Sequence, residues 1–445
     1  TETFKPSEAK PVELPPWAKK VEAVPPLPTS KINPVVTMLP NGLRLIIQQE
    51  SISPTVSVVG EVKNNADLEE PMGKEGVSDV LTGLFSYGTG SYDRLSFQKA
   101  QDDIAADITA GTSFSLRVLS DRFERGMELL ADDLLHPALP ESSFAVVQQE
   151  LISSLRGQIQ TPAYFSKRAL REALYPKNDP VLRDATPESV AALSLQDVRE
   201  YYSKAFRPDM TTIVIIGQVT PERARRAVEK LFGSWKASGE KPQSDLPPVP
   251  PNKPAVALIP DANSVQNRVT LTETVGMTRS NPEYYKLQLG NHVLSGAFYA
   301  TRLYHELREN AGLVYSIESS IDAGKNRSLF SVVYACDPPN TDRARALVER
   351  NLRDMQTTTV TQDELRLAKT LLVRQVPLGE ASIDSIAGTL LSYSLEDLPL
   401  NESVRAAEKF LETTAEEVRE AFKKWIRPAD FVQITVGPNP EHGTQ

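Results

Sequence analysis

The stretch SLQDVREYYSKAFRPDMTTIVIIG at residues 194–217 recurs in altered form as TAEEVREAFKKWIRPADFVQITVG at residues 414–437, 220 positions later. Each copy begins with a hydroxyl residue followed three positions on by an acidic residue, a capping-box pattern that predicts the start of a helix. Each copy then breaks at an Arg-Pro step and continues into an apolar run that predicts a buried strand. Because all these features recur in register, the sequence indicates a duplicated domain.

Two proline-rich segments mark the limits of the copies. Residues 1–34 contain eight prolines and predict an extended arm. Residues 237–254 form a second such segment and predict a semi-rigid linker. The expected organisation is therefore an arm, one domain at 35–236, the linker, a second domain at 255–438 and a tail at 439–445.

Each copy has strand patterns grouped apart from helix patterns. Asn41-Gly42 between two apolar runs predicts a hairpin near the start of the first copy. The fold expected is α+β, with two duplicated domains, each a mostly antiparallel sheet with helices on one face. Amphipathic helices are predicted at Phe144–Leu155, Tyr164–Leu174 and Leu195–Ala205 in the first copy, and at Asn281–Leu294, Phe298–Asn310, Asp342–Met355 and Gln362–Val373 in the second.

Composition excludes several classes of function. The net charge of −9 provides no basic surface for nucleic acid or anionic lipid. No apolar run approaches the roughly 18 residues of a membrane span. Cys336 is the only cysteine, so an internal disulfide and a cysteine-based zinc cluster are excluded, and its apolar surroundings predict a buried side chain. The start at Thr1 and the proline-rich arm suit a removed export leader, which favours the periplasm modestly over mitochondrion or cytosol.

The segment GVSDVLTGLFSYGT at residues 76–89 resembles the G-x-x-H-x-x-E-H…G-T frame of pitrilysin-type zinc peptidases, which include mitochondrial processing peptidase. In that family two His on one helix face bind zinc and the Glu deprotonates a bound water. The matching positions here are Asp79, Thr82 and Gly83, so both His ligands and the Glu base are absent. The resemblance implies a bi-lobed clamshell of duplicated domains that has lost its metal motif.

No other residues replace the lost ligands. The position matching the family's third ligand lies near Ser154, with Glu150 one turn earlier. The four histidines, at 136, 292, 305 and 442, are too far apart to form a helical ligand pair. The acidic residues Glu69, Glu70, Glu75 and Asp79 are interpreted as a solvated loop. We therefore expect no metal and no other cofactor in this chain.

Residues 301–316, TRLYHELRENAGLVYS, resemble the family's second-domain signature S-R-L-x-x-x-x-R-x-x-x-G-L-x-Y-S, with Thr301 as the one departure. The resemblance implies that Arg308 and Tyr315 hold a peptide substrate and polarise its scissile carbonyl. Gly312 is placed as a helix C-cap, and Leu313–Ile317 is predicted as a strand. Spacing alone leaves a structural role for both residues open. Arg302 is expected in an ion pair and Leu303 in the core.

We hypothesise that this chain is one subunit of a heterodimer in which the two subunits supply different parts of one active site. A homologous H-x-x-E-H subunit would supply zinc, and this chain would supply Arg308 and Tyr315 for cleavage of a peptide or unfolded polypeptide. Three alternatives remain open: a structural scaffold subunit, a peptide-binding module that does not cleave, and an autonomous hydrolase. The last has little support, because no nucleophile elbow, P-loop or dinucleotide fingerprint is present.

Overall fold

The hairpin predicted at Asn41-Gly42 is present in the computed structural model, which describes residues 23–296 and 300–438. It joins β1 (Val35–Met38) to β2 (Arg44–Gln49) in antiparallel register, with Val35 opposite Ile47. Gly42 has φ of 89°, a conformation that favours glycine.

The first half is built on a six-stranded sheet in the order β1-β2-β6-β3-β5-β4. Neighbouring strands are antiparallel except for β2 and β6. The remaining strands are β3 (Thr55–Val62), β4 (Asp107–Thr109), β5 (Ser113–Leu119) and β6 (Thr211–Gly217). Its helices are α2 (Ala66–Glu69), α3 (Val77–Leu84), α4 (Arg94–Asp102), α5 (Phe123–Leu135), α6 (Glu141–Gln158), α7 (Pro162–Leu174), α8 (Pro187–Ala191), α9 (Leu195–Ala205) and α10 (Pro221–Phe232).

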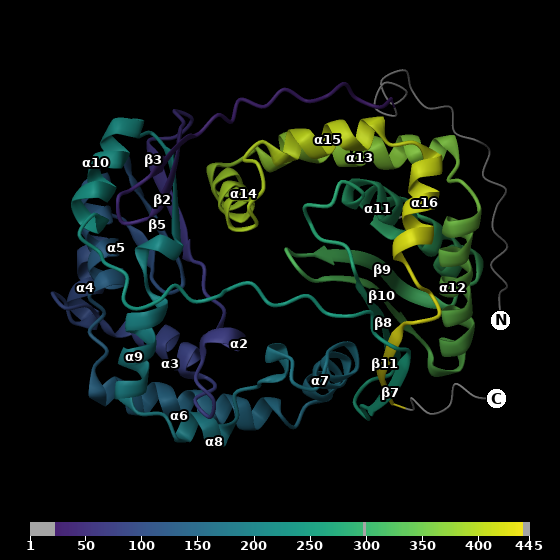
Figure 1. Ribbon diagram of the computed structural model, residues 1–445, viewed down its shortest axis with the longest axis horizontal. Coiled ribbons are helices and arrows are strands. Elements are labelled where there is room, and N and C mark those ends of the chain that lie inside the picture. Colours follow the sequence, from purple (N-terminus) through teal and green to yellow (C-terminus); the bar gives the residue numbers. More distant parts are fainter. Residues whose placement is uncertain (1–22, 297–299, 439–445) are drawn as a thin grey trace, which may run out of the picture.

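The second half is built on a five-stranded sheet in the order β7-β11-β8-β10-β9, in which only β7 and β11 are parallel. Figure 1 shows the two sheets in separate lobes that face each other. The predicted α+β class and mostly antiparallel sheets are confirmed. The strands are β7 (Ala255–Pro260), β8 (Asn267–Val275), β9 (Val314–Ala323), β10 (Ser328–Cys336) and β11 (Val432–Gly437), and the α-helices are α11 (Tyr284–Asn291), α12 (Thr341–Thr357), α13 (Gln362–Gly379), α14 (Ile383–Leu395), α15 (Glu402–Glu412) and α16 (Ala415–Trp425).

The duplicated segment folds as its sequence predicts. Ser194 and Asp197 form a capping box at the start of α9, and Thr414 and Glu417 form the equivalent box at α16. The strands that follow, β6 and β11, lie inside their sheets, and every residue of β6 is buried.

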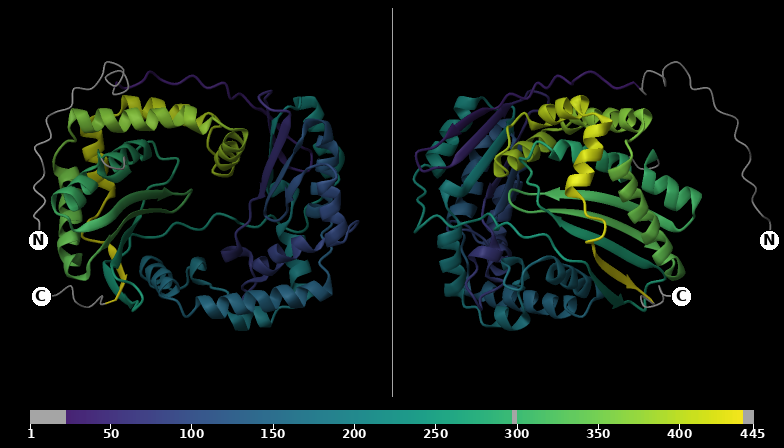
Figure 2. Two further views of the ribbon diagram at one scale, coloured as in Figure 1. Left: turned by 180° about the vertical axis from the view of Figure 1, so that it is seen from behind. Right: turned by 45° about the vertical axis from the view of Figure 1, so that its right-hand side comes forward.

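One helix from each half crosses to the sheet of the other half. α14 packs on β6 and β3, and α7 packs on β11 and β7. Figures 1 and 2 show both helices in the space between the two sheets. Each sheet therefore carries helices of its own half on one face and a single helix of the opposite half on the other. The buried contacts join Ile386, Ala387 and Leu390 to Ile46, Val214 and Ile216, and Leu174 to Val432 and Ile434.

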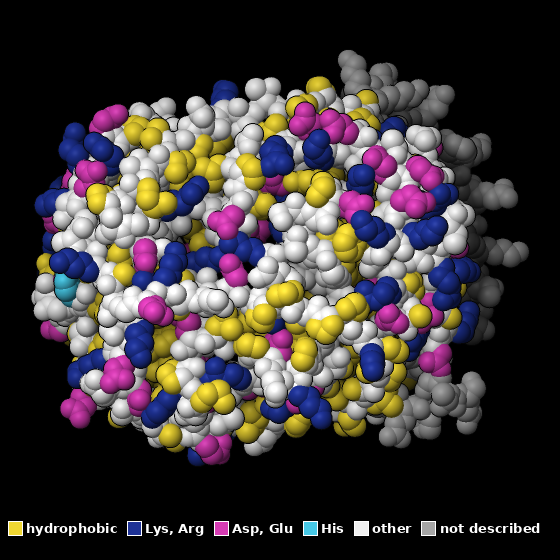
Figure 3. Space-filling view, in the orientation of Figure 1, with side chains coloured by type: hydrophobic (Ala, Val, Ile, Leu, Met, Phe, Trp, Pro, Cys, Tyr) yellow, Lys and Arg dark blue, Asp and Glu magenta, His cyan; other side chains and the backbone are white. Residues whose placement is uncertain are grey.

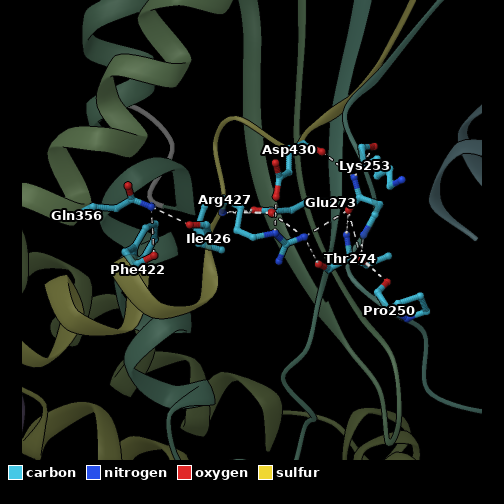
Figure 4. Close-up of polar contacts among 10 residues, drawn as sticks. Pro250, Lys253, Glu273, Thr274, Gln356, Phe422, Ile426, Arg427 and Asp430 are labelled. Atoms are coloured by element: carbon cyan, nitrogen blue, oxygen red, sulfur yellow. Dashed lines mark hydrogen bonds and ion pairs between the residues drawn. The ribbon is translucent and has the colours of Figure 1, made fainter.

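The linker is held at both ends by the two arginines of the repeated Arg-Pro step. Arg207 donates to the carbonyls of Ser238 and Glu240, at 3.1 and 2.6 Å. Figure 4 shows Arg427 beside Glu273 and Asp430, and its guanidinium donates to the Thr274 carbonyl at 2.9 Å. Thr274 in turn accepts the backbone N–H of Asn252 on its hydroxyl.

Ion pairs join both halves to the middle of the linker. Figure 3 shows charged side chains gathered near the centre of the face where the linker crosses between the lobes. Lys63 of the first half and Lys325 of the second both pair with Asp245 of the linker, at 2.8 and 3.4 Å. The linker is therefore bound along its length.

Two predicted helices of the second half differ from expectation. The helix predicted at 281–294 is the shorter α11, followed by a π-helical turn at His292–Gly296. The helix predicted at 298–310 is a π-helix at Tyr304–Asn310, and its first two predicted residues lie outside the described part of the chain. The first of these helices ends at Ser295-Gly296, and glycine is a poor helix former.

Candidate functional site

The three degenerate zinc-motif positions lie on α3. Thr82 is exposed and donates its hydroxyl to the carbonyl of Ser78 at 2.8 Å, within the same helix. Partial desolvation raises the pKa of the Asp79 carboxyl, and the Glu70 carboxylate raises it further. Neither side chain lies in a group suited to a metal.

Gly83, at the second of the family's two His positions, is in close contact with α6. A β-carbon built on Gly83 would lie 2.6 Å from Cγ1 of Val147. Val147 is buried, so its methyl groups occupy the space that a ligand side chain at position 83 would need. The residues present therefore do not fit a zinc ion bound in the manner of the family.

Three acidic residues near α3, Glu69, Glu70 and Glu75, are structural, which corrects the prediction of a solvated acidic loop for them. Asp79 is exposed, as predicted. Glu70 accepts the backbone N–H groups of Gly76 and Ser78, each at 3.0 Å, and so caps the start of α3. Glu75 pairs with Arg183 at 2.9 Å. Glu69 accepts the backbone N–H of Asn65 at the start of α2. These carboxylates have partners far along the chain or at helix ends, which charge pattern alone does not reveal.

The remaining candidate ligands lie apart from one another. Ser154 and Glu150 are exposed on α6. His136 lies beside Asp132, at 3.5 Å, and His305 contacts Glu309. Burial lowers the pKa of His292 to about 4. His442 lies outside the described residues, and within 23–296 and 300–438 no group of three or more His, Cys, Asp or Glu side chains could hold a metal ion.

Arg308 and Tyr315 converge on one cleft in the second half. Arg308 lies in the π-helix before Gly312, whose φ of 60° reverses the chain into β9. The guanidinium carbon of Arg308 lies 4.9 Å from the centre of the Tyr315 ring and 5.2 Å from that of Tyr304. One N–H of Arg308 donates to the backbone carbonyl of Tyr315. The Tyr315 side chain is 69% exposed, so its hydroxyl is open to a ligand.

The cleft around this pair has a volume of about 490 Å³. Arg268 of β8 and Glu318 of β9 line it, as does Tyr304. The sequence patterns give no signal for these three residues. Tyr304 falls at a variable position of the signature, and Arg268 reaches the cleft only because β8 and β9 both pair with β10.

The neighbouring signature residues support the fold. Arg302 makes a two-pronged ion pair with Glu364 of α13, at 2.6 and 2.8 Å. Leu303 is fully buried in the core of the second half. The expectations of an ion pair and a core position are therefore confirmed, with the ion pair inside one half. Cys336 is also fully buried, as predicted.

Comparison with known proteins agrees with this geometry. Residues 192–372, which include the Arg308–Tyr315 cleft, match the family model described as the peptidase M16 inactive domain. This part of the chain is similar to the M16, or pitrilysin-type, peptidase family. Among curated relatives, the uncharacterized zinc protease YmxG of Bacillus subtilis is 22% identical over 78% of this chain and 84% of its own. The non-peptidase homolog YmxG of Helicobacter pylori is 21% identical over 73% and 76% of the two chains.

Solved structures share the M16 fold over nearly the whole chain. The peptidase M16 inactive domain from Pseudomonas fluorescens has a TM-score of 0.80 and 21% identity, and the match covers 92% of this chain and 98% of that one. The periplasmic protease PqqL from Escherichia coli has a TM-score of 0.79 and 17% identity, with 93% of this chain aligned to 46% of that one. No helix in the described part of this chain is long and apolar enough to cross a membrane.

Proposed function

We propose that this chain is the zinc-free subunit of a heteromeric M16 metallopeptidase. The observation that carries the proposal is the contrast between its two halves. In the first half the three motif positions hold Asp79, Thr82 and Gly83, and Val147 fills the adjacent space. In the second half Arg308 and Tyr315 lie together in an open cleft. A chain that served only as a scaffold would have no need to keep this pair exposed.

Arg308 and Tyr315 would bind and polarise a peptide substrate. One N–H of Arg308 donates to the Tyr315 carbonyl, and this hydrogen bond fixes the position of the guanidinium. The other N–H groups would be available to a substrate backbone carbonyl. The exposed Tyr315 hydroxyl would donate to the oxygen on which negative charge develops. Stacking of the guanidinium on two tyrosine rings limits its motion, so both donors are pre-positioned.

The partner in this proposal is a homologous H-x-x-E-H subunit in a heterodimer. Its zinc would supply the activated water, which this chain cannot. The substrate would be a peptide or unfolded polypeptide able to enter between two bi-lobed chains. The periplasm is the compartment we propose, and its support is limited to the fold shared with the periplasmic protease PqqL.

The decisive experiment measures zinc-dependent peptidase activity of the H-x-x-E-H subunit, of this chain, and of their mixture. We expect activity in the mixture well above either subunit alone. Arg308→Ala or Tyr315→Phe should reduce it by about 10²–10³-fold in kcat, the usual effect of removing a donor to a developing oxyanion. Arg343→Ala, which removes an exposed arginine of α12, serves as the matched control and should have no effect.

The rival functions predict different results. A scaffold subunit would give equal activity with wild-type chain, Arg308→Ala and Tyr315→Phe. A peptide-binding module that does not cleave would bind peptide alone and leave the partner's activity unchanged. Full activity of the zinc subunit without this chain would refute the proposal.

A further inference from the structure

A second pocket lies in the first half, away from the Arg308–Tyr315 cleft, and we call it the Asp133 pocket. Its volume is about 360 Å³, within the roughly 300–1,000 Å³ typical of small-molecule sites. It is bounded by the end of α3, by α4, by α5 and by β4 at the edge of the sheet. The lining residues used below are Phe85, Arg94, Phe97, Gln101, Asp107 and Asp133.

Asp133 is a buried carboxylate without a hydrogen-bond donor. It lies near the end of α5 and only 4% of its surface is exposed. Among the described residues no donor lies within hydrogen-bond distance of its Oδ1. Burial, together with the smaller effect of the Asp132 carboxylate, raises the pKa of Asp133 to about 7. Because a buried carboxylate without a partner is costly, folded proteins rarely keep one that nothing binds.

The arginine that lines the same pocket does not neutralise Asp133. The Arg94 guanidinium is stacked over the Tyr87 ring, 5.2 Å from its centre. The side-chain oxygen of Gln101 accepts the backbone N–H of Ile108, and its side-chain NH2 makes no hydrogen bond to Oδ1 of Asp133. No described donor therefore satisfies Oδ1 of Asp133, and this oxygen is available to a ligand.

The other residues that line the pocket indicate the chemistry of the ligand. Phe85 and Phe97 are buried aromatic side chains, suited to the methylene stem of a long cationic side chain and to its charge. Asp107, which is exposed, adds negative charge at the rim. One carboxylate at the base does not provide the several convergent ligands of a metal site. A flexible apolar stem that ends in a hydrogen-bond-donating cation matches all of these features.

We propose that the Asp133 pocket binds an ammonium or guanidinium group that donates hydrogen bonds to the Asp133 carboxylate. The cation is either the side chain of a basic residue in a peptide or a free small molecule of the same chemistry. The proposal goes beyond the partner-subunit function and does not depend on it, since the isolated chain contains every residue involved.

Isothermal titration of the full chain at pH 8 tests this directly. The probes are N-acetyl-arginine amide, N-acetyl-lysine amide and their uncharged counterparts N-acetyl-citrulline amide and N-acetyl-norleucine amide. We expect the cationic probes to bind at least tenfold more tightly than the uncharged ones. An alanine-based pentapeptide with a central arginine separates the two sources, because tighter binding than the single amino acid indicates a peptide and equal binding indicates a free small cation.

Binding should also depend on pH. A proton competes with the cation for Asp133, so affinity for the arginine probe should fall roughly tenfold between pH 8 and pH 6. The charged or titratable groups facing Asp133 or lining the pocket are Asp132, Arg94, Asp107 and Tyr202.

Two variants assign the effect to Asp133. Asp133→Asn should abolish discrimination between charged and uncharged probes without lowering the melting temperature, because the native carboxylate makes no hydrogen bond that the variant would lose. Asp107→Asn at the rim should weaken the cationic probes by less than threefold. Equal binding of charged and uncharged probes, no binding at 10 mM probe, or full binding by Asp133→Asn would each overturn the proposal.

Discussion

A β-carbon at position 83 would lie 2.6 Å from Cγ1 of Val147, so α3 and α6 approach as closely as they do because residue 83 has no side chain. Gly83 stands where the family places a zinc ligand, and Val147 has taken the space. The loss of the metal motif is therefore coupled to repacking of a helix pair. Restoring only the motif residues on α3 would not restore the site.

A double-mutant cycle tests this coupling. Gly83→Ala should destabilise the protein by about 1 kcal/mol, because the overpacking cost of about 1–3 kcal/mol exceeds the gain of about 1 kcal/mol in helix propensity. In a Val147→Ala background the same change should stabilise, since the clash is gone. Chemical denaturation measures all four proteins. Additive effects of the two substitutions would show that the contact is not tight.

The buried ion pair between Arg327 and Asp179 should be a principal link between the lobes. It has two hydrogen bonds of 2.8 Å, and the side chains are 11% and 4% exposed. We expect Arg327→Met to cost about 3–5 kcal/mol, because the Asp179 carboxylate is then buried without its partner. Arg327→Met with Asp179→Asn should recover part of this loss. Thermal and chemical denaturation provide the measurement.

A more exposed pair between the first half and the linker supplies the control for that prediction. Lys63 and Asp245 are 2.8 Å apart, with side chains 26% and 42% exposed. Lys63→Met should cost no more than about 1 kcal/mol, as is usual for solvent-screened pairs. Equal losses at the two positions would argue against a special contribution of the buried pair.

Glu273 should make stability fall as the pH rises from about 4.5 to about 7. It is fully buried, accepts the backbone N–H of Arg427 at 2.9 Å, and burial raises its pKa from 4.5 to about 7. The native state therefore holds a proton that the unfolded chain releases between these values. This stabilisation is complete below about pH 4.5 and lost above about pH 7. Its largest value is about 3 kcal/mol, because each unit of pKa difference corresponds to about 1.4 kcal/mol.

Glu273→Gln isolates this contribution. The glutamine oxygen can still accept the Arg427 N–H, and no charge is buried at high pH. The melting temperature of the variant relative to wild type should therefore rise from pH 5 to pH 8. Parallel melting curves for the two proteins over this interval would contradict the prediction.

Tyr315→Phe should leave stability nearly unchanged. The side chain is 69% exposed and its hydroxyl makes no hydrogen bond within the described chain, so the change should be within about 0.5 kcal/mol. Denaturation of the isolated chain checks this result. Combined with a loss of kcat in the two-subunit assay, it would separate a role on substrate from a role in folding.

Much of the fold follows from local sequence. Several elements depend on only a few neighbouring residues, so the sequence alone predicts them. They are the capping boxes at Ser194 and Thr414, the Asn41-Gly42 turn and the apolar runs of β6 and β11. The duplication follows from the same signals repeated at one spacing. The sequence also shows that the zinc motif is absent at positions 79, 82 and 83. It shows equally that Arg308 and Tyr315 belong to one signature.

Only the tertiary structure decided how distant segments meet. The exchange of α7 and α14 between the lobes buries Leu174 and Leu390 on sheets more than a hundred residues away, and no local pattern distinguishes that partner from a nearer one. The partners of Glu75 and Asp179, and the isolation of Asp133, likewise depend on which side chains folding brings within hydrogen-bond distance. A sequence shows which residues prefer a buried or capped position, but the free energy of a polar group depends on neighbours that exist only after the lobes have packed.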